Sequence, residues 1–310
     1  MKAVFLDKDT FSIDLPTPPN ISHFTTYGHT PQDDDVIVER CMNADIIITN
    51  KVVLTKAILM RLPNLKLIHI TATGTNNVDL SACQTLGIKV FNVAGYSVVS
   101  VPEHTLMLML TAMRAGLYYH RVATDGTWQA DGKFCLVNEP IFDLSGRTLG
   151  IIGAGTLGKQ VGTIAKAFGM KVLYAERQNI PPRNEDYTAF DDVLAQADVI
   201  SLHCALTDDT HHLINHQTLA KMQKRPLLIN MARGAVVDAK AVAWALDEGL
   251  ILGFASDVFE QEPPLPSDPL LALKNHPRVF FTPHNAWASV GAQTRLWQIL
   301  CEQIEAFVGN

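Results

Sequence analysis

The chain has 310 residues, 47% of them hydrophobic, and a formal net charge of -6 at pH 7. This length allows two domains with substantial cores, and the absence of basic runs with interleaved aromatic residues argues against nucleic-acid binding. An N-terminal apolar run too short for a signal peptide, and five scattered cysteines without a C-x-x-C pair, indicate a cytoplasmic protein with buried thiols and no metal site.

The first part of the chain alternates short β-branched runs with helical stretches, which is typical of a small parallel α/β unit. The expected strands are residues 2–6, 45–49, 67–70 and 88–91, and the expected helices lie near residues 33–41, 55–62 and 80–86. Because ligand-binding loops of such units follow the carboxyl ends of strands, the candidate loops are Asn50-Lys51 and residues 71–77.

These two loops hold three candidate substrate-binding residues. Thr73 and Gly74 lie in a polar stretch that can present backbone amides to an anion. A plain connecting turn, with Asp79 capping the next helix, is an equal alternative. Lys51 could contact the substrate, although a lysine at a strand end is more often a solvated surface charge.

A long helix that opens at Pro102 leads out of this first unit. Its strongest apolar stretch, residues 105–113, is too short to cross a bilayer. Apolar residues surround this helix, so we expect it to be covered from several sides, with a second subunit as one source of cover. Residues 124–144 are irregular, with Trp128 and Phe134 expected as isolated anchors.

The most informative stretch is residues 149–158, where an apolar strand ends in the spacing G-x-G-x-x-G and a helical pattern follows. Gly153 permits a tight turn, Gly155 lets a pyrophosphate approach the backbone, and Gly158 lets the helix pack close to the strand. The spacing alone also fits an ordinary strand-to-helix turn. The next strand, residues 171–175, strengthens the prediction of a dinucleotide site because it is followed by an acidic residue.

That acidic residue, Glu176, stands close to where dinucleotide folds place the carboxylate that binds the adenosine ribose. A carboxylate there repels a ribose phosphate, so the predicted cofactor is NAD. Arg177 keeps NADP possible, since its guanidinium could receive the phosphate if Glu176 moved away.

Four further strands, at residues 198–202, 226–230, 252–256 and 279–282, alternate with helices near residues 215–222 and 239–248. We therefore expect an α/β protein of two doubly wound parallel-sheet domains, with a Rossmann dinucleotide-binding domain inserted into a flavodoxin-like substrate domain. The expected boundaries are 1–97 for the substrate domain, 98–283 for the NAD-binding domain, and 284–310 for a C-terminal return, whose helix packs back on the first domain.

Three ionisable residues follow strands of the second sheet: Arg233, Glu262 and His284. The carboxyl ends of such strands converge on the ligand crevice. An arginine can hold a carboxylate through two parallel hydrogen bonds, and a histidine beside a glutamate can exchange a proton near neutral pH. Each residue alone has a structural alternative; together with a dinucleotide site they predict hydride transfer to a 2-oxo acid.

With these residues in view, the sequence resembles the D-isomer-specific 2-hydroxyacid dehydrogenases over nearly its whole length. The resemblance is carried, in the family's order, by the segments 153–158, 201–204 (Ser-Leu-His-Cys), 230–234 (Asn-Met-Ala-Arg-Gly), 257–263 (Asp-Val-Phe-Glu-Gln-Glu-Pro) and 282–284 (Thr-Pro-His). It implies that Arg233 binds the substrate carboxylate, Glu262 supports the catalytic acid, and His284 protonates the carbonyl as hydride arrives.

The resemblance also implies coenzyme and substrate contacts. Asp257 would hold the nicotinamide amide, and Gly74 would present its backbone to the substrate carboxylate. The remaining implied coenzyme-binding positions are Gly153, Gly155, Thr156, Leu157, Glu176, His203 and Ala232.

Two positions depart from the commonest family pattern. Ala205 replaces a proline, which could loosen the loop on the adenine side, and Asn285 replaces an aliphatic residue. Neither change removes a catalytic group.

Within the family, residues 72–79, 93–97 and 282–287 are most similar to glycerate dehydrogenases that act as hydroxypyruvate reductases. The expected enzyme is thus a homodimer that reduces hydroxypyruvate or glyoxylate to D-glycerate or glycolate. Alternatives are a D-lactate or 3-phosphoglycerate dehydrogenase, and a non-enzymatic dinucleotide-sensing protein similar to the co-repressors built on this fold. Formate dehydrogenase is disfavoured because Glu262 stands where that branch resembles Gln.

Overall fold

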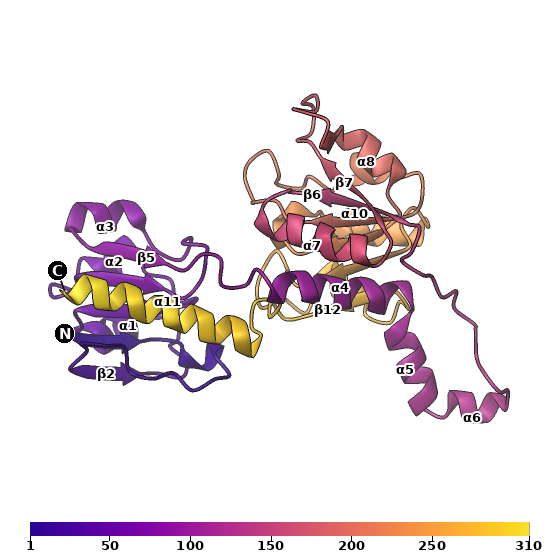
Figure 1. Cartoon of the computed structure of the whole chain (residues 1–310). Helices are drawn as coiled ribbons and strands as arrows, with labels where there is room; N and C mark the ends of the chain where they lie inside the picture. The colour runs from indigo at the N-terminus through magenta and orange to yellow at the C-terminus, as the bar shows by residue number, and fades with distance from the viewer. Residues whose placement is uncertain (310) are drawn as a thin grey trace. The chain divides into compact units, whose positions relative to one another are not determined.

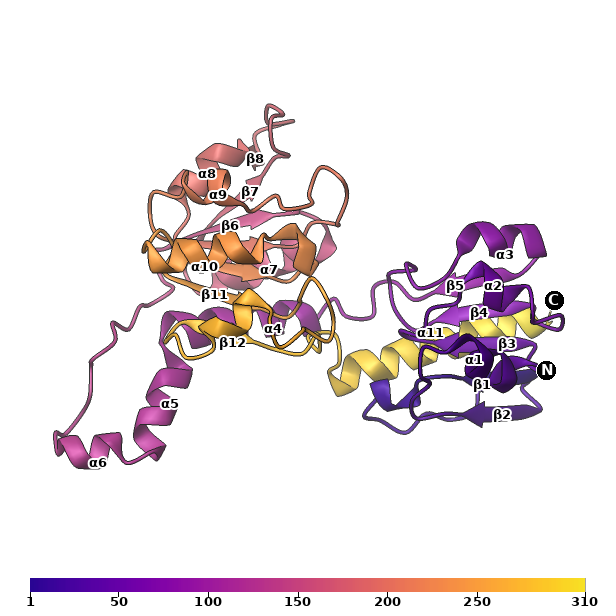
Figure 2. The same cartoon turned by 180° about the vertical axis from the view of Figure 1, so that it is seen from behind.

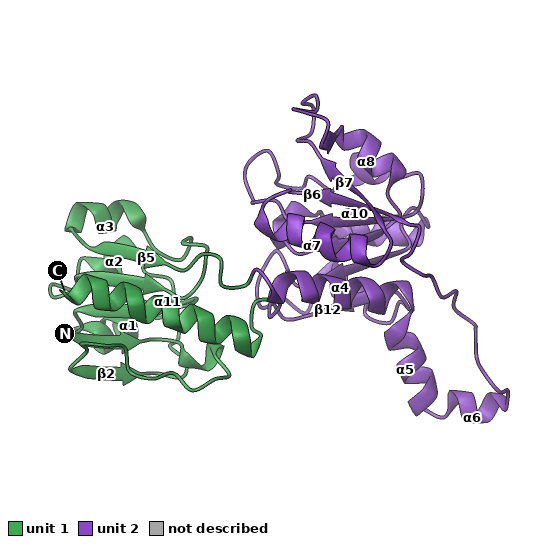
Figure 3. Cartoon of the chain, in the orientation of Figure 1, with its two compact units in different colours: residues 1–97, 287–310 green, residues 98–286 purple. Residues whose placement is uncertain are grey.

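The computed structural model describes residues 1–309, which fold as two compact units (Figure 3). Unit 1 contains residues 1–97 and the chain from Trp287 onward, and unit 2 contains Val98–Ala286. The predicted return began at residue 284; residues 284–286 instead belong to unit 2. The reason is local, since the backbone amides of Asn285 and Ala286 donate to the carboxylate of Asp257.

Unit 1 is a five-stranded parallel sheet with the order β2-β1-β3-β4-β5, which is the flavodoxin-like order. Its strands are β1 (Lys2–Phe5), β2 (His23–Thr26), β3 (Ile46–Thr49), β4 (Leu67–Ile70) and β5 (Lys89–Asn92). The sequence pattern missed β2, an edge strand with one apolar residue and no apolar run. The short 3-10 helix η1 (Lys8–Thr10) follows β1.

Helices cover both faces of this sheet (Figure 1). On one face, α1 (Asp34–Cys41), α2 (Lys56–Leu59) and α3 (Leu80–Leu86) pack against a core that includes Val4, Ile47 and Ile68. On the other face, Leu296, Trp297 and Leu300 of α11 (Val290–Gly309) pack against alternate residues of the same strands. The C-terminal helix is therefore part of the core of unit 1.

Unit 2 is a seven-stranded parallel sheet with the order β12-β11-β10-β9-β6-β7-β8. Its strands are β6 (Thr148–Ile152), β7 (Lys171–Ala175), β8 (Tyr187–Thr188), β9 (Val199–Leu202), β10 (Leu227–Asn230), β11 (Gly253–Ser256) and β12 (Val279–Phe281). The order runs outward from β6 in both directions, so the topological switch point lies between β6 and β9. This is the Rossmann order with one added strand, and the predicted fold class is confirmed.

The helices of unit 2 form layers on the two faces of its sheet. Helices α8 (Phe190–Gln196), α9 (His216–Leu219) and α10 (Ala239–Asp247) share one core cluster with the sheet, and the 3-10 helix η3 (Pro269–Leu273) adds to it. Helices α4 (Ser100–Met113) and α7 (Thr156–Ala167) contact each other, and α4 also contacts β10, β11 and β12. Another 3-10 helix, η2 (Gly234–Val236), follows β10. No helix within residues 1–309 has the length and apolar character that a membrane span requires.

Helix α5 (Gly116–Thr124) ends where the segment predicted to be irregular begins, and that segment, residues 124–144, contains one short helix, α6 (Thr127–Asp131). Both helices extend away from the sheet of unit 2, and an extended stretch of chain returns to β6 (Figures 1 and 2). Trp128 is 42% exposed and Phe134 is 95% exposed, so the prediction that they anchor this segment within the chain is wrong.

Candidate active site

The glycines after β6 hold neighbouring backbones close together. Gly153 has φ +101°, and a Cβ on it would lie 2.4 Å from the backbone nitrogen of Cys204 in the loop after β9. A Cβ on Gly158 would lie 2.2 Å from the carbonyl oxygen of Gly153. A Cβ on Gly155 would meet nothing within 4 Å. Gly153 and Gly158 therefore serve the fold, whereas Gly155 borders open space.

This open space lies at the start of α7. Gly155 is the residue that precedes the helix, and it provides no side chain to cap the backbone amides of the first turn. Uncapped amides at the positive end of a helix are suited to binding a phosphate. Thr156 and Leu157 form that first turn.

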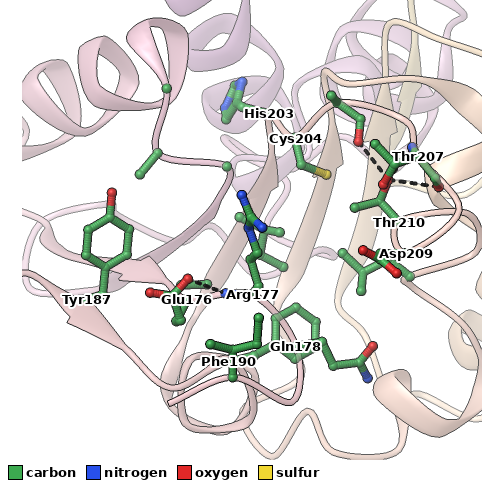
Figure 4. Close-up of a pocket in the computed structure, with 18 of the residues that line it drawn as sticks. Glu176, Arg177, Gln178, Tyr187, Phe190, His203, Cys204, Thr207, Asp209 and Thr210 are labelled. Atoms are coloured by element: carbon green, nitrogen blue, oxygen red, sulfur yellow. Dashed lines mark hydrogen bonds between the residues drawn. The ribbon is translucent and has the colours of Figure 1, made fainter. Parts of the chain in front are cut away.

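A cavity of about 740 Å³ lies at the carboxyl ends of β6, β7 and β9, next to the switch point (Figure 4). Of the residues predicted to bind a cofactor, Gly153, Gly155, Glu176 and His203 line it. Its volume is in the range of ligand pockets. Thr156, Leu157, Ala232 and Asp257 are not among the lining residues; the last two follow β10 and β11.

His203 lines this cavity and has one ring nitrogen without a hydrogen-bond partner among residues 1–309. Its backbone amide donates to Ile152, and its Nε2 lies 2.9 Å from the hydroxyl of Ser201. Its Nδ1 is buried and has no hydrogen-bond partner among residues 1–309. Burial lowers the pKa of His203 to about 4, so the ring is neutral near pH 7.

The loop after His203 is held by Thr210. The Thr210 hydroxyl donates to the carbonyl oxygen of Ala205 at 2.7 Å and accepts from the amide of Thr207 at 2.8 Å. These bonds constrain the loop at Ala205, where the commonest family pattern has a proline.

Three more loops lie at the same carboxyl edge of the sheet, farther from β6. They follow the adjacent strands β10, β11 and β12. A Cβ on Gly234 would lie 1.9 Å from the carbonyl carbon of Phe259, so the loop that carries Arg233 packs directly on the loop that leads to Glu262. Arg233 is exposed, and one of its guanidinium nitrogens donates to the carbonyl oxygen of Ala232 at 2.7 Å. Within residues 1–309, no carboxylate forms an ion pair with it.

His284 and Glu262 form the hydrogen-bonded pair that their order in the sequence suggested. His284 Nδ1 lies 2.6 Å from one carboxylate oxygen of Glu262, and the other oxygen accepts from the amide of Phe259 at 3.0 Å. Both side chains are partly exposed, at 27% for His284 and 35% for Glu262. A carboxylate that accepts from Nδ1 leaves Nε2 as the ring atom available for proton exchange with another group.

Buried Asp257 fixes the segment that carries His284. Its carboxylate accepts from the hydroxyl of Thr282 at 2.5 Å and from the amides of Asn285 and Ala286 at 3.0 Å. His284 itself has φ +51°, which is unfavourable for a residue with a Cβ. The bonds on both sides of His284 hold it in this conformation.

His104 on α4 completes this group and was not selected from the sequence. Its Nε2 lies 2.9 Å from the Thr282 hydroxyl and 3.6 Å from the Asp257 carboxylate. Burial lowers the pKa of His104, and the charge of Asp257 opposes the shift. The one signal in the sequence was a histidine next to Glu103, near the start of a helix that is mostly apolar after it.

The three residues expected to bind substrate lie in unit 1, in the loops after the adjacent strands β3 and β4. The amide of Lys51 donates to the carboxylate of Asp7 at 2.6 Å, and the amide of Asn50 donates to it at 2.9 Å. Thr73, which precedes Gly74, donates through its hydroxyl to the carbonyl of Val93. Asp7 thus shapes the β3 loop, and no sequence motif marked it.

Comparisons with known proteins agree with this arrangement. The family described as "D-isomer specific 2-hydroxyacid dehydrogenase, NAD binding domain" matches residues 106–286. A glycerate dehydrogenase from Methylorubrum extorquens is 39% identical over 100% of this chain and 96% of its own length. A hydroxypyruvate reductase from Blautia hydrogenotrophica is 33% identical over 89% of this chain and 86% of its own.

A solved structure gives the same result. The D-lactate dehydrogenase of Aquifex aeolicus, determined with NAD and lactic acid, superposes with a TM-score of 0.78 and 28% identity, covering 99% of this chain and 96% of that one. The chain belongs to the D-isomer-specific 2-hydroxyacid dehydrogenases. It is an NAD-dependent enzyme that interconverts 2-oxo acids and D-2-hydroxy acids, as its sequence predicted.

The residues around the cavity fit NAD. An uncapped helix start and a glycine that borders open space fit a pyrophosphate, and the unpaired ring nitrogen of His203 fits a polar group of the adenosine.

We predict that Gly155→Val separates coenzyme binding from folding. The new side chain meets open space in the protein alone, so the melting temperature stays close to that of the wild type. It occupies the approach to the first turn of α7, so NADH binding, measured by fluorescence titration, weakens at least about tenfold. Gly153→Val is the contrasting variant, because it should destabilise the fold itself. Unchanged NADH binding by the Gly155 variant would exclude this glycine from the pyrophosphate site.

Proposed function

We propose that the enzyme reduces hydroxypyruvate and glyoxylate to D-glycerate and glycolate. The proposal rests first on the relatives named glycerate dehydrogenase, hydroxypyruvate reductase and glyoxylate reductase, which include proteins 39%, 33% and 34% identical to this chain. The observation that carries the chemistry is the hydrogen bond between His284 and Glu262, beside the loop of an exposed arginine.

In this proposal the three residues have different roles. Arg233 binds the substrate carboxylate through its guanidinium, which forms no ion pair with a carboxylate among residues 1–309. His284 donates a proton from Nε2 to the carbonyl oxygen of the substrate. Glu262 orients the ring and stabilises its protonated form before the transfer. The bound NADH supplies the hydride.

Lys51, Thr73 and Gly74 are proposed to contact the substrate from unit 1, Gly74 through its backbone. In unit 2, Asp257 is proposed to contact the nicotinamide amide, and the remaining coenzyme contacts are assigned to Gly153, Gly155, Thr156, Leu157, Glu176, His203 and Ala232. We also propose a cytoplasmic location, supported by cysteines that are all free thiols.

The substrate is tested by assaying the purified enzyme with NADH and a panel of hydroxypyruvate, glyoxylate, pyruvate and 3-phosphohydroxypyruvate. We expect the highest kcat/KM with hydroxypyruvate and measurable reduction of glyoxylate. A higher value with pyruvate or with the phosphorylated acid would assign the enzyme to D-lactate or 3-phosphoglycerate metabolism. No oxidation of NADH with any of the acids would favour the sensor alternative.

The His284 and Glu262 roles predict a specific change in the pH profile. In Glu262→Gln the amide keeps the size of the side chain but removes the charge that stabilises the imidazolium. We expect the pH above which reduction slows to move downward, and kcat at pH 7.5 to fall by roughly 10²-fold or more. His284→Ala should lose most of the rate at every pH while still binding NADH. A Glu262 variant with the wild-type pH profile would contradict this pairing.

We further propose a homodimer in which the arm formed by residues 116–141 binds a second copy of the chain. The supporting observation is a set of exposed apolar residues on this arm: Leu117, Trp128, Phe134, Val137 and Ile141. Apolar side chains gathered on a projecting segment are typical of a protein-protein interface.

The interface is tested with the double variant Phe134→Asp and Val137→Asp. By light scattering, we expect the wild type at about twice the 34.1 kDa mass of the chain and the variant at the monomer mass at micromolar concentration. Leu265→Asp is the matched control, because Leu265 is a half-exposed apolar residue outside the arm. A double variant that remains dimeric would place the interface elsewhere.

A further inference from the structure

The carboxylate of Glu176, at the edge of the cavity, is fully engaged by Arg183. The Nε of Arg183 donates to one carboxylate oxygen at 2.6 Å and a terminal guanidinium nitrogen donates to the other at 2.5 Å. The backbone amides of Arg177 and Arg183 donate to the same two oxygens at 2.9 and 3.1 Å. A carboxylate has about four acceptor positions, so none remains for another donor.

Arg183 also shields this carboxylate from solvent. The Glu176 side chain is 1% exposed and that of Arg183 is 50% exposed. The guanidinium carbon lies 4.4 Å from the centre of the Tyr187 ring, so a cation-π contact holds Arg183 in addition to its bonds with Glu176. The pKa of Glu176 is lowered to about 2, mainly by the hydrogen bonds from the Arg183 side chain, so the pair stays ionised over the working pH range.

A second arginine borders the same end of the cavity. Arg177 lines it beside Glu176 (Figure 4). Two guanidinium groups lie here, and the carboxylate of Glu176 beside them is the covered one; the carboxylate of Asp209 also lines the cavity. A ribose 2′-hydroxyl gains little from a carboxylate that has no free acceptor position. A 2′-phosphate meets a neutralised carboxylate and two arginines.

We propose that Arg183 is a specificity-determining residue that allows this NAD-dependent enzyme also to bind NADP(H). While Arg183 covers Glu176, the exposed part of the Arg183 guanidinium binds the 2′-phosphate together with the guanidinium of Arg177. When NAD(H) binds, the ribose hydroxyls compete with Arg183 for the carboxylate. The inference concerns coenzyme choice alone and is independent of the substrate proposed above.

The test measures binding rather than turnover, by titrating the enzyme with NADH and with NADPH and following coenzyme fluorescence. We expect the wild type to bind both. In Arg183→Ala the carboxylate is uncovered and a cation is lost, so NADPH binding should weaken at least about tenfold while NADH binding is unchanged or tighter. In Glu176→Gln the preference should shift the other way, toward NADPH.

Three further measurements separate this role from a structural one. Arg295→Ala removes the same charge from α11 in unit 1 and should change neither affinity. Arg177→Ala should weaken NADPH binding selectively. Displacement of NADH by 2′,5′-ADP and by 5′-AMP measures the contribution of the 2′-phosphate, which only the first competitor carries. In Arg183→Ala, 2′,5′-ADP should become a poorer competitor and 5′-AMP should not. Equal weakening of both coenzymes in that variant, or a wild type that does not bind NADPH, would overturn the proposal.

Discussion

The site in unit 2 depends on backbones that approach more closely than any side chain permits. Gly153 lets the loop after β6 contact the loop after β9, and Gly158 lets α7 begin against that same turn. Gly234 does the equivalent between the loops after β10 and β11. Parallel strands lie about 4.8 Å apart, so a Cβ at any of these positions would force neighbouring loops apart. Because every candidate residue in unit 2 lies on or beside one of these loops, the absence of three side chains sets the geometry of the site.

Two carboxylates in unit 2 illustrate how the basic partner decides what a similar arrangement can do. Glu262 and Glu176 each accept a hydrogen bond from a backbone amide of their own loop, and each binds a basic side chain. The partner of Glu262 is a partly exposed histidine, a side chain that can carry out proton transfer. The partner of Glu176 is an arginine, which stays charged, so this pair can open only by exchanging one charged or polar partner for another. The first arrangement suits proton transfer and the second suits recognition.

The sequence predicted features that repeat along the chain or follow directly from one motif. The alternation of strands and helices indicated both parallel sheets, and the spacing of glycines before Thr156 identified the turn into α7. His284 and Glu262 could be found because each follows a strand, and neighbouring strands end at the same edge. Family resemblance added the expected roles.

The features that were missed depend on contacts between residues without a motif. Edge strand β2 is defined by its pairing with β1, and its own sequence, His-Phe-Thr-Thr, has a single apolar residue. In the sequence, Asp7 is a charged residue that follows a strand. It accepts from the amides of Asn50 and Lys51 because β1 and β3 are adjacent in the sheet. Arg183 lies in a polar loop, where nothing in its neighbours shows that it turns back to Glu176. Trp128 was misread because an isolated aromatic residue has no pattern that separates an internal anchor from an exposed surface.

Asp257 shows how a structural and a binding role can share one side chain. Three donors already use its carboxylate: the Thr282 hydroxyl and the Asn285 amide on Oδ1, and the Ala286 amide on Oδ2. With about four acceptor positions on a carboxylate, the remaining one is on Oδ2. Thr282 gives its only proton to Asp257, so the Nε2 of His104 must donate to the Thr282 oxygen. A coenzyme amide that binds Asp257 would therefore use Oδ2. The same carboxylate holds His284 in its left-handed conformation, so a coenzyme contact there and the placement of His284 would be linked through one buried charge.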